Sequence, residues 1–167
     1  MMRKPAIFLT VTMIGIAGLG LAHLAHPVPR LVWNASASLP IGLYRILPGG
    51  PRRGDLVLVR PPENAAILAD HRGYLPAGVP LVKRIAAVGG DRVCAVGGVV
   101  FINGQIVAHQ LSADRAGRPL PRGSGCKVLG GDEIFVLADA ADSFDSRYFG
   151  PVPTTTIIGR LVALWTE

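Results

Sequence analysis

Residues 81–107 read LVKRIAAVGGDRVCAVGGVVFINGQIV, and this stretch decides the fold. It holds short runs rich in valine and isoleucine, namely residues 81–88, 93–96, 99–102 and 105–107. Glycine pairs separate the first runs, and Asn103-Gly104 separates the last two. An Asn-Gly pair between apolar runs is the strongest short signal for a two-residue hairpin turn. The stretch therefore predicts consecutive antiparallel β-strands.

Further runs of the same kind lie on both sides of this stretch. They are residues 56–59, which lie between Gly54-Asp55 and Pro61-Pro62, and residues 133–137 and 157–165. Residues 64–70 are the one place where a short helix is expected. Because no linker or low-complexity segment interrupts residues 30–167, we predict one mainly β, antiparallel domain over this range.

A run without charged residues, Pro5 to Ala22, precedes that domain. In a helix, about 18 residues extend about 27 Å, close to the roughly 30 Å hydrocarbon core of a bilayer. Arg3 and Lys4 stand before the run, and the positive-inside rule places that end in the cytoplasm. We therefore predict a cytoplasmic tip and transmembrane anchor over residues 1–26 and a domain beyond the membrane over residues 27–167. A cleavable signal peptide is the alternative, although the apolar core of such peptides is usually only about 7–15 residues long.

Composition excludes several classes of protein. Half of the 167 residues are hydrophobic and 17% are charged, which excludes a disordered chain. The net charge is +6, but the arginines are spread along the sequence rather than clustered, which argues against a nucleic-acid partner. The domain lacks H-E-x-x-H, P-loop and G-x-G-x-x-G motifs, so we expect neither a metal nor a cofactor.

The chain has two cysteines, Cys94 and Cys126, and neither belongs to a C-x-x-C motif. This spacing disfavours zinc and thioredoxin-like chemistry. In the oxidising compartment beyond the membrane, two lone cysteines of one domain can pair. We predict a Cys94–Cys126 disulfide, with two buried thiols as the alternative.

Lys83 lies in the most apolar predicted strand. Side chains alternate along a strand, so Lys83 shares a face with Leu81, Ile85 and Ala87. Loss of hydration there lowers the pKa of an amine and produces a neutral amine that can accept a proton. Arginine could not do this. From these residues alone, the alternative is a lysine whose stem packs against the protein and whose amine reaches water.

Two polar stretches accompany the lysine. Ser36 and Ser38 lie in residues 33–44, WNASASLPIGLY, soon after the apolar run. Residues 137–151 read LADAADSFDSRYFGP. A solvated turn is the simple interpretation of this second stretch, but Asp145 and Arg147 could form an ion pair there, and Ser143 could hydrogen-bond an amine.

Together, these three stretches resemble the type I signal peptidases. The motifs are Ser-x-Ser-Leu-Pro at residues 36–40, Val-Lys-Arg-Ile at 82–85 before Gly-Gly-Asp, and Asp-Ser-x-Asp-Ser-Arg-Tyr-Phe-Gly at 142–150. Residues 34–45 and 143–152 are more similar to the conjugative-transfer branch, the TraF-like pilin-processing peptidases. The resemblance extends from the predicted anchor nearly to the C-terminus. Leu39 stands where housekeeping members commonly carry Met, and Asp142 where they often carry Asn.

The resemblance implies a fold and a mechanism. The fold is a signal-peptidase-like antiparallel β catalytic domain with one N-terminal transmembrane helix. Ser38 would be the nucleophile, and Lys83 the general base of a Ser-Lys dyad. Ser36 would donate to the oxyanion, and Ser143 would hold the amine of Lys83. Asp145 and Arg147 would brace their loop as an ion pair.

The function implied is that of a serine endopeptidase anchored in the bacterial inner membrane, with its catalytic domain in the periplasm. It would process exported pilin or secretion-apparatus precursors in conjugative transfer, with the prepilin and the conjugation apparatus as partners. The acyl-enzyme would be resolved by water or, giving a circular product, by the amino terminus of the same pilin. One alternative is a general signal peptidase I. A second is a catalytically inactive envelope component.

Overall fold

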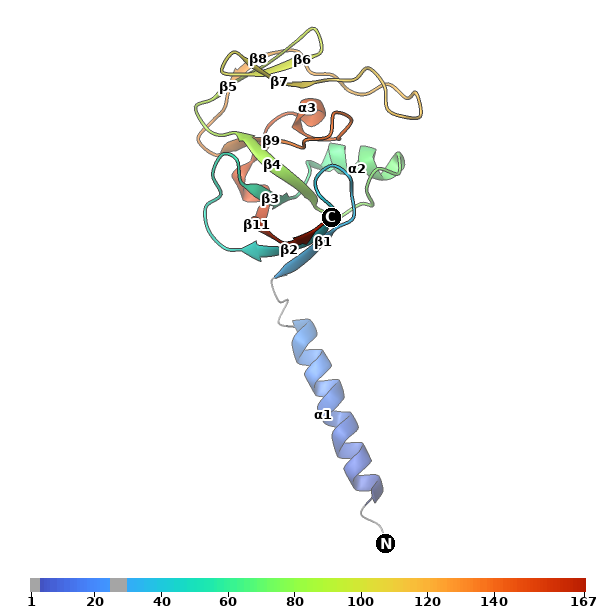
Figure 1. Ribbon diagram of the computed structural model, residues 1–167. Helices are drawn as coiled ribbons and strands as arrows, with labels where there is room; N and C mark the ends of the chain where they lie inside the picture. The colour runs from blue at the N-terminus through green and yellow to red at the C-terminus, as the bar shows by residue number, and fades with distance from the viewer. Residues whose placement is uncertain (1–3, 25–29) are drawn as a thin grey trace. The chain divides into compact units, whose positions relative to one another are not determined.

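The computed structural model describes residues 4–24 and 30–167 (Figure 1). The chain divides into two units, Met1–Arg30 and Leu31–Glu167. Helix α1 (Lys4–Leu24) covers the charge-free run of the first unit. Within the described residues, no helix combines the length and the apolar character that crossing a membrane requires. The predicted boundary between residues 26 and 27 falls outside the described residues.

The second unit is built from two antiparallel sheets. The larger sheet has the strand order β1-β2-β11-β3-β4-β9-β10, and the smaller has the order β7-β6-β5-β8. The strands are β1 (Leu31–Asn34), β2 (Gly42–Leu47), β3 (Leu56–Val59), β4 (Leu81–Ala87), β5 (Arg92–Val96), β6 (Val99–Ile102), β7 (Gln105–His109), β8 (Gly125–Val128), β9 (Glu133–Leu137), β10 (Val152–Pro153) and β11 (Ile157–Thr166). The helices are α2 (Glu63–His71) and α3 (Ser146–Phe149), and a single 3₁₀ turn, η1 (Thr154–Thr156), precedes β11. The prediction of a mainly β, antiparallel domain is confirmed.

The hairpin between β6 and β7 forms where the Asn-Gly pair predicted it. Asn103 and Gly104 both have positive φ, 51° and 83°, as a two-residue turn of this kind requires. The predicted strand at residues 81–88 ends one residue early, at Ala87, and the short helix expected at residues 64–70 is α2. Strands β1, β2, β8 and β10 and helix α3 were not predicted.

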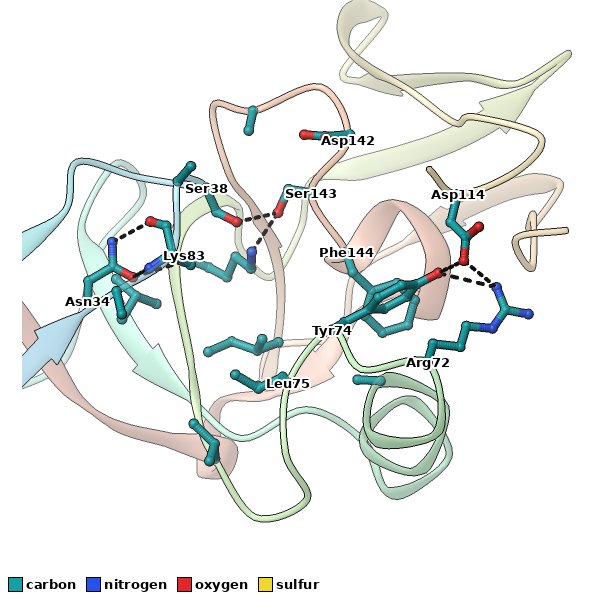
Figure 2. A pocket seen from close by; sticks show the side chains of 18 of the residues that line it. Asn34, Ser38, Arg72, Tyr74, Leu75, Lys83, Asp114, Asp142, Ser143 and Phe144 are labelled. Carbon is teal, nitrogen blue, oxygen red and sulfur yellow. Dashed lines mark hydrogen bonds and ion pairs between the residues drawn. The ribbon is translucent and has the colours of Figure 1, made fainter. Parts of the chain in front are cut away.

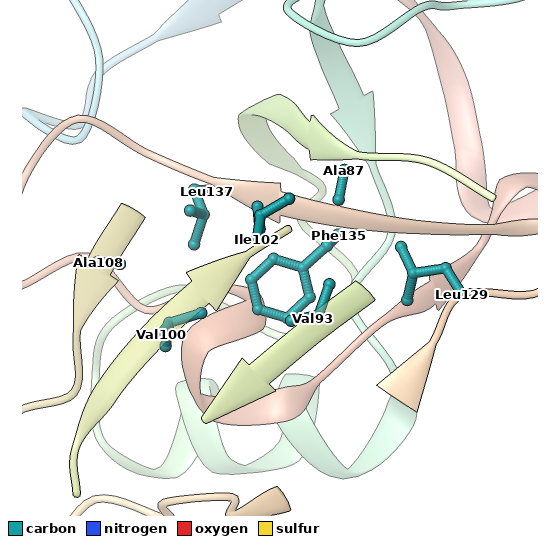
Figure 3. Packing of buried hydrophobic residues seen from close by; sticks show 8 residues of the cluster. All are labelled: Ala87, Val93, Val100, Ile102, Ala108, Leu129, Phe135 and Leu137. Carbon is teal, nitrogen blue, oxygen red and sulfur yellow. The ribbon is translucent and has the colours of Figure 1, made fainter. Parts of the chain in front are cut away.

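A shared hydrophobic core joins the two sheets (Figure 3). Ala87, Phe135 and Leu137 come from β4 and β9, and they pack against side chains of the smaller sheet. Those side chains are Val93, Val100, Ile102 and Ala108, with Leu129 beside them. Val136 belongs to a second cluster, so β9 is buried on both faces. Four of the five residues of β9 are therefore buried, whereas β4 is buried at Lys83, Ile85 and Ala87.

The predicted disulfide between Cys94 and Cys126 is confirmed. The two residues are paired across β5 and β8. All four residues of β8 are exposed, so this strand contributes little to the core. The disulfide is therefore the strongest link between β8 and the rest of the domain.

Removing this disulfide should destabilise the domain. In the chain-entropy model, closing a loop of 32 residues contributes about 3–4 kcal/mol. We expect the Cys94→Ser, Cys126→Ser double variant to lose about that much unfolding free energy in urea denaturation. Adding reductant to the wild type should produce the same loss. A double variant as stable as the oxidised wild type would contradict this expectation.

Candidate active site

The amine of Lys83 is buried in the large sheet. Its side chain is 3% exposed, whereas its neighbour Arg84 on the same strand is exposed, as the alternation along β4 predicts. Desolvation lowers the pKa of Lys83 from 10.5 to about 8. The negative charge of Asp145 raises this pKa and the positive charge of Arg147 lowers it, and both effects are smaller than that of burial. The alternative of an amine that reaches water is wrong.

Hydrogen bonds join this amine to two serine hydroxyls (Figure 2). The Nζ of Lys83 donates to the Oγ of Ser143 at 2.6 Å. The Oγ of Ser143 donates to the Oγ of Ser38 at 3.4 Å. Ser38 and Lys83 are thus connected through Ser143. A hydroxyl can both donate and accept, so this chain can reverse its direction when the amine is neutral.

Asn34 fixes the loop that carries Ser38. This buried side chain lies at the end of β1, and its amide donates to the carbonyl oxygens of Ser36 (3.0 Å), Leu39 (3.1 Å) and Pro40 (3.0 Å). Its Oδ1 accepts from the backbone N–H of Ser36 at 3.2 Å and from the Ser36 hydroxyl at 2.9 Å. The hydroxyl expected to serve an oxyanion therefore donates to Asn34 in this structure.

The residues after Ser38 fasten the other end of this loop. Leu39 is buried, and the carbonyl of Pro40 accepts from the hydroxyl of Tyr44 at 2.7 Å. A Cβ on Gly42 would lie 2.1 Å from the carbonyl oxygen of Trp165, so only glycine lets β11 approach this closely. Pro40 and Gly42 thus hold the end of this loop against the sheet.

Sequence reasoning missed Asn34. Its signal was the place of an amide side chain just before a Ser-x-Ser pair, where it can bond the backbone a few residues on. Asn34→Asp would replace the donating amide with a carboxylate that faces three carbonyl oxygens. Small displacements of reacting groups cost about 10²-fold in rate. If Ser38 is the nucleophile that the resemblance implies, we expect a loss of about that size in kcat/KM for peptide cleavage.

Asn64→Asp is the matched control for this variant. It also adds one negative charge, but in the first turn of α2, where the helix dipole favours a carboxylate. We expect wild-type activity for this control. Equal activity of Asn34→Asp and wild type would show that the Asn34 bonds do not position Ser38.

An ion pair braces the loop that carries Ser143. Asp145 and Arg147 are 0% and 5% exposed, and their side chains meet at 2.8 Å (Nε to Oδ1) and 3.0 Å (Nη2 to Oδ2). Arg147 also donates to the carbonyl oxygens of Ala138 (3.1 Å) and Ala141 (2.7 Å). Asp145 accepts from the backbone N–H of Ala138 at 3.0 Å. These bonds close the loop upon itself, with Ser143 at its tip.

A pocket of about 740 Å³ opens beside these groups. Ser36, Ser38, Lys83 and Ser143 all line it. Its other walls come from β1, from the segment after α2 and from the segment between β7 and β8. Its polar groups can activate a hydroxyl. Among the described residues, His, Cys, Asp and Glu side chains do not gather into a group that could hold a metal ion.

Comparison with known proteins identifies the family of this chain. The model of the family described as "Signal peptidase, peptidase S26" matches residues 3–166. The chain belongs to this family. The predicted resemblance to type I signal peptidases is confirmed.

Within the S26 family, the chain lies in the TraF-like branch. It is 35% identical over 168 residues to a plasmid transfer protein TraF of Escherichia coli, covering 93% of this chain and 94% of the relative. It is 39% identical over 137 residues to a probable conjugal transfer protein TraF of Sinorhizobium fredii, covering 75% of this chain and 72% of the relative. A signal peptidase I of Leptolyngbya laminosa is 34% identical over 113 residues, which cover 67% of this chain and 51% of that protein.

Proposed function

We propose that this S26 family member is a membrane-anchored serine endopeptidase that processes exported pilin or secretion-apparatus precursors in conjugative transfer. The observation that carries the proposal is the buried amine of Lys83, with its lowered pKa, linked through Ser143 to the hydroxyl of Ser38 in a pocket. The family and the names of the TraF relatives support the reaction class and the setting.

In the proposed mechanism, the Ser38 oxygen attacks the scissile carbonyl carbon while its proton moves to the Lys83 amine, directly or by way of Ser143. The oxyanion accepts hydrogen bonds from the Ser38 backbone N–H and from the Ser36 hydroxyl, which turns away from Asn34. The C–N bond then breaks as the ammonium of Lys83 protonates the leaving amine. Water, deprotonated by the same amine, hydrolyses the acyl-enzyme.

Co-expression with candidate prepilins tests this function. Mass spectrometry should find a shortened pilin with the wild type and the uncleaved precursor with Ser38→Ala. Cleavage at an equal rate by Ser38→Ala would contradict the dyad mechanism. If both Ser38→Ala and Lys83→Ala leave transfer and cleavage unchanged, the protein is an inactive envelope component.

The same mass measurement separates two fates of the acyl-enzyme. If water resolves it, the product is linear. If the amino terminus of the same pilin resolves it, the product is circular and lacks the mass of one water. A circular product would show that the amino terminus competes with water for the acyl-enzyme, and a linear product would remove that step while leaving the peptidase in place.

A general signal peptidase I is the second candidate, favoured by the identity to the Leptolyngbya protein. The chain spans about half the length of that relative. Complementation of a cell depleted of its signal peptidase decides between the two: growth supports broad substrate range, and failure with intact pilin processing supports the dedicated enzyme.

We further propose that residues 1–26 form a cytoplasmic tip and an inner-membrane anchor, and that residues 27–167 lie in the periplasm. The charge-free run with its preceding Arg3 and Lys4 supports the anchor. On the second unit, the rings of Trp33 and Trp165 stack with centroids 5.8 Å apart, and both side chains are half exposed. Indole rings of this kind favour the headgroup region of a bilayer.

Spheroplast proteolysis tests this topology. Protease added outside should degrade residues 27–167, and the intact chain should stay in the membrane fraction after a high-salt wash. Protection from outside protease, or release by salt, would contradict it.

A further inference from the structure

The segment between β7 and β8, residues 110–124, forms one wall of the pocket, and we call it the strap. Asp114, Arg115, Arg118 and Leu120 of the strap line the same pocket as Ser38 and Lys83. The strap lies far from both in the sequence, and no motif of the S26 resemblance includes it.

Asp114 fastens the strap to the segment after α2. Its side chain is 7% exposed. It accepts from the hydroxyl of Tyr74, from the Nε of Arg118 at 2.7 Å and from the backbone N–H groups of Ala116 and Arg118, each at 2.9 Å. The Nη1 of Arg72 lies 3.7 Å from the same carboxylate. These contacts hold the strap against the segment after α2, where it lines the pocket.

The strap also contacts the loop of Ser143. Tyr74, whose hydroxyl bonds Asp114 of the strap, packs its ring on that of Phe144, with centroids 5.5 Å apart. Figure 2 shows these two rings between Ser143 and the Arg72–Asp114 pair. The Nε of Arg115 donates to Asp142 at 2.7 Å. A substrate that reaches Ser38 and continues past Phe144 therefore meets the strap.

Positive charge exceeds negative charge at this end of the pocket. Arg72 and Arg118 share the single carboxylate of Asp114, and Arg115 is paired with Asp142. One guanidinium charge is thus left without a counterion among the lining residues. A cleft with apolar walls focuses such a field on whatever enters it.

Of these arginines, Arg118 is best placed to bind a carboxylate of the substrate. Its side chain is 41% exposed, and its guanidinium carbon lies 5.6 Å from the centre of the Tyr74 ring. Its Nε bonds Asp114, and its Nη2 donates to the carbonyl of Arg72 at 3.1 Å. Its Nη1 has no hydrogen-bond partner among the described residues, so it can donate to a further carboxylate.

We propose that the strap end of the pocket is a subsite for an acidic side chain of the substrate, with Arg118 as its ligand. This proposal rests on the proposed function, because it takes the occupant of the pocket to be a peptide. It adds a charge preference that the dyad itself does not provide.

Peptide binding to the Ser38→Ala protein tests the subsite without turnover. The probes are fluorescent alanine-rich peptides with one Glu placed at each position in turn, and matched peptides with Gln. We expect one Glu position to bind about five-fold more tightly than its Gln counterpart, the effect of a partly exposed charge pair. Adding Arg118→Gln to the Ser38→Ala protein should abolish this preference.

Arg122→Gln in the same Ser38→Ala background is the matched control, because Arg122 belongs to the strap but does not line the pocket. Its Glu preference should stay unchanged. An equal loss in both variants, or equal affinity for Glu and Gln peptides at every position, would overturn the subsite. If Arg118→Gln does not fold, the salt dependence of peptide binding provides the test. The Glu preference of the Ser38→Ala protein should decrease at high ionic strength, and a preference independent of salt would overturn the proposal.

Cleavage by the wild type separates the subsite from the proposed function. Equal kcat/KM for Glu and Gln peptides would remove the subsite and leave the peptidase. Preferential binding of Glu peptides by the Ser38→Ala protein, with no cleavage by the wild type, would remove the peptidase and leave the subsite.

Discussion

Lys83→Met should lower kcat/KM for peptide cleavage by about 10⁴-fold, the upper range for the loss of a general base. Methionine fills similar space but cannot accept the proton of Ser38. Lys83→Arg should be equally inactive, because a guanidinium stays protonated at any pH the protein survives. Cleavage of a fluorogenic peptide measures both variants.

Lys127→Met is the matched control. Lys127 is an exposed lysine whose amine pairs with Glu133 at 2.6 Å, and its loss removes the same charge from the surface. We expect unchanged cleavage for this control. A Lys83→Met protein that keeps more than a tenth of wild-type activity would show that another group takes the proton.

Lys83→Met should also stabilise the fold at neutral pH. The pKa of Lys83 falls from 10.5 to about 8 on folding, so the folded state disfavours the charged amine. At about 1.4 kcal/mol per pH unit, this pKa shift destabilises the folded state by about 3 kcal/mol below pH 8. The destabilisation diminishes as the pH rises toward 10.5. Loss of the bond to Ser143 offsets about 1 kcal/mol of the gain. Urea denaturation at pH 7 should show Lys83→Met about 2 kcal/mol more stable than wild type.

Asp145→Asn should destabilise the domain by about 3–5 kcal/mol. It leaves the guanidinium of Arg147, which is 5% exposed, without the charge that compensates it. The loop of Ser143 would loosen with it, so cleavage should fall as well. Thermal or urea unfolding measures the first effect, and peptide cleavage the second.

Asp139→Asn is the control for that variant. Asp139 is in the same loop, but its side chain is 67% exposed and lies 3.9 Å from the Nε of Arg84. A surface pair of this kind contributes less than about 1 kcal/mol. An Asp145→Asn protein within 1 kcal/mol of this control would contradict a structural role for the buried pair.

Much of the fold could be predicted because the strand signals are local. Residues 99–102 and 133–137 are apolar runs bounded by turn residues, and they form β6 and β9 with those bounds. β8 carries no such signal, because all four of its residues are exposed and pairing with β5 and the disulfide hold it in place. β1 was missed because its four residues run directly into the polar Ser36 stretch, and among the described strands it pairs with β2 alone.

The candidate site also combines features that local sequence predicts with features that depend on the tertiary fold. The burial of Lys83 follows from alternation along an apolar strand. The placement of Ser143 between that amine and Ser38 does not, because it depends on how the loop closes around Asp145 and Arg147. The strap contacts join residues about 40 positions apart, Tyr74 with Asp114, and no local pattern encodes them.

Titration of the Lys83 amine tests the proposed mechanism most directly. Selective lysine labelling and NMR can follow that one amine, with the Lys83→Met protein assigning the signal. The proposed dyad predicts a pKa of about 8, lowered by burial, and a kcat/KM that rises with pH through the same value. An amine that stays cationic until its ordinary pKa near 10.5 would contradict a neutral base beside Ser38.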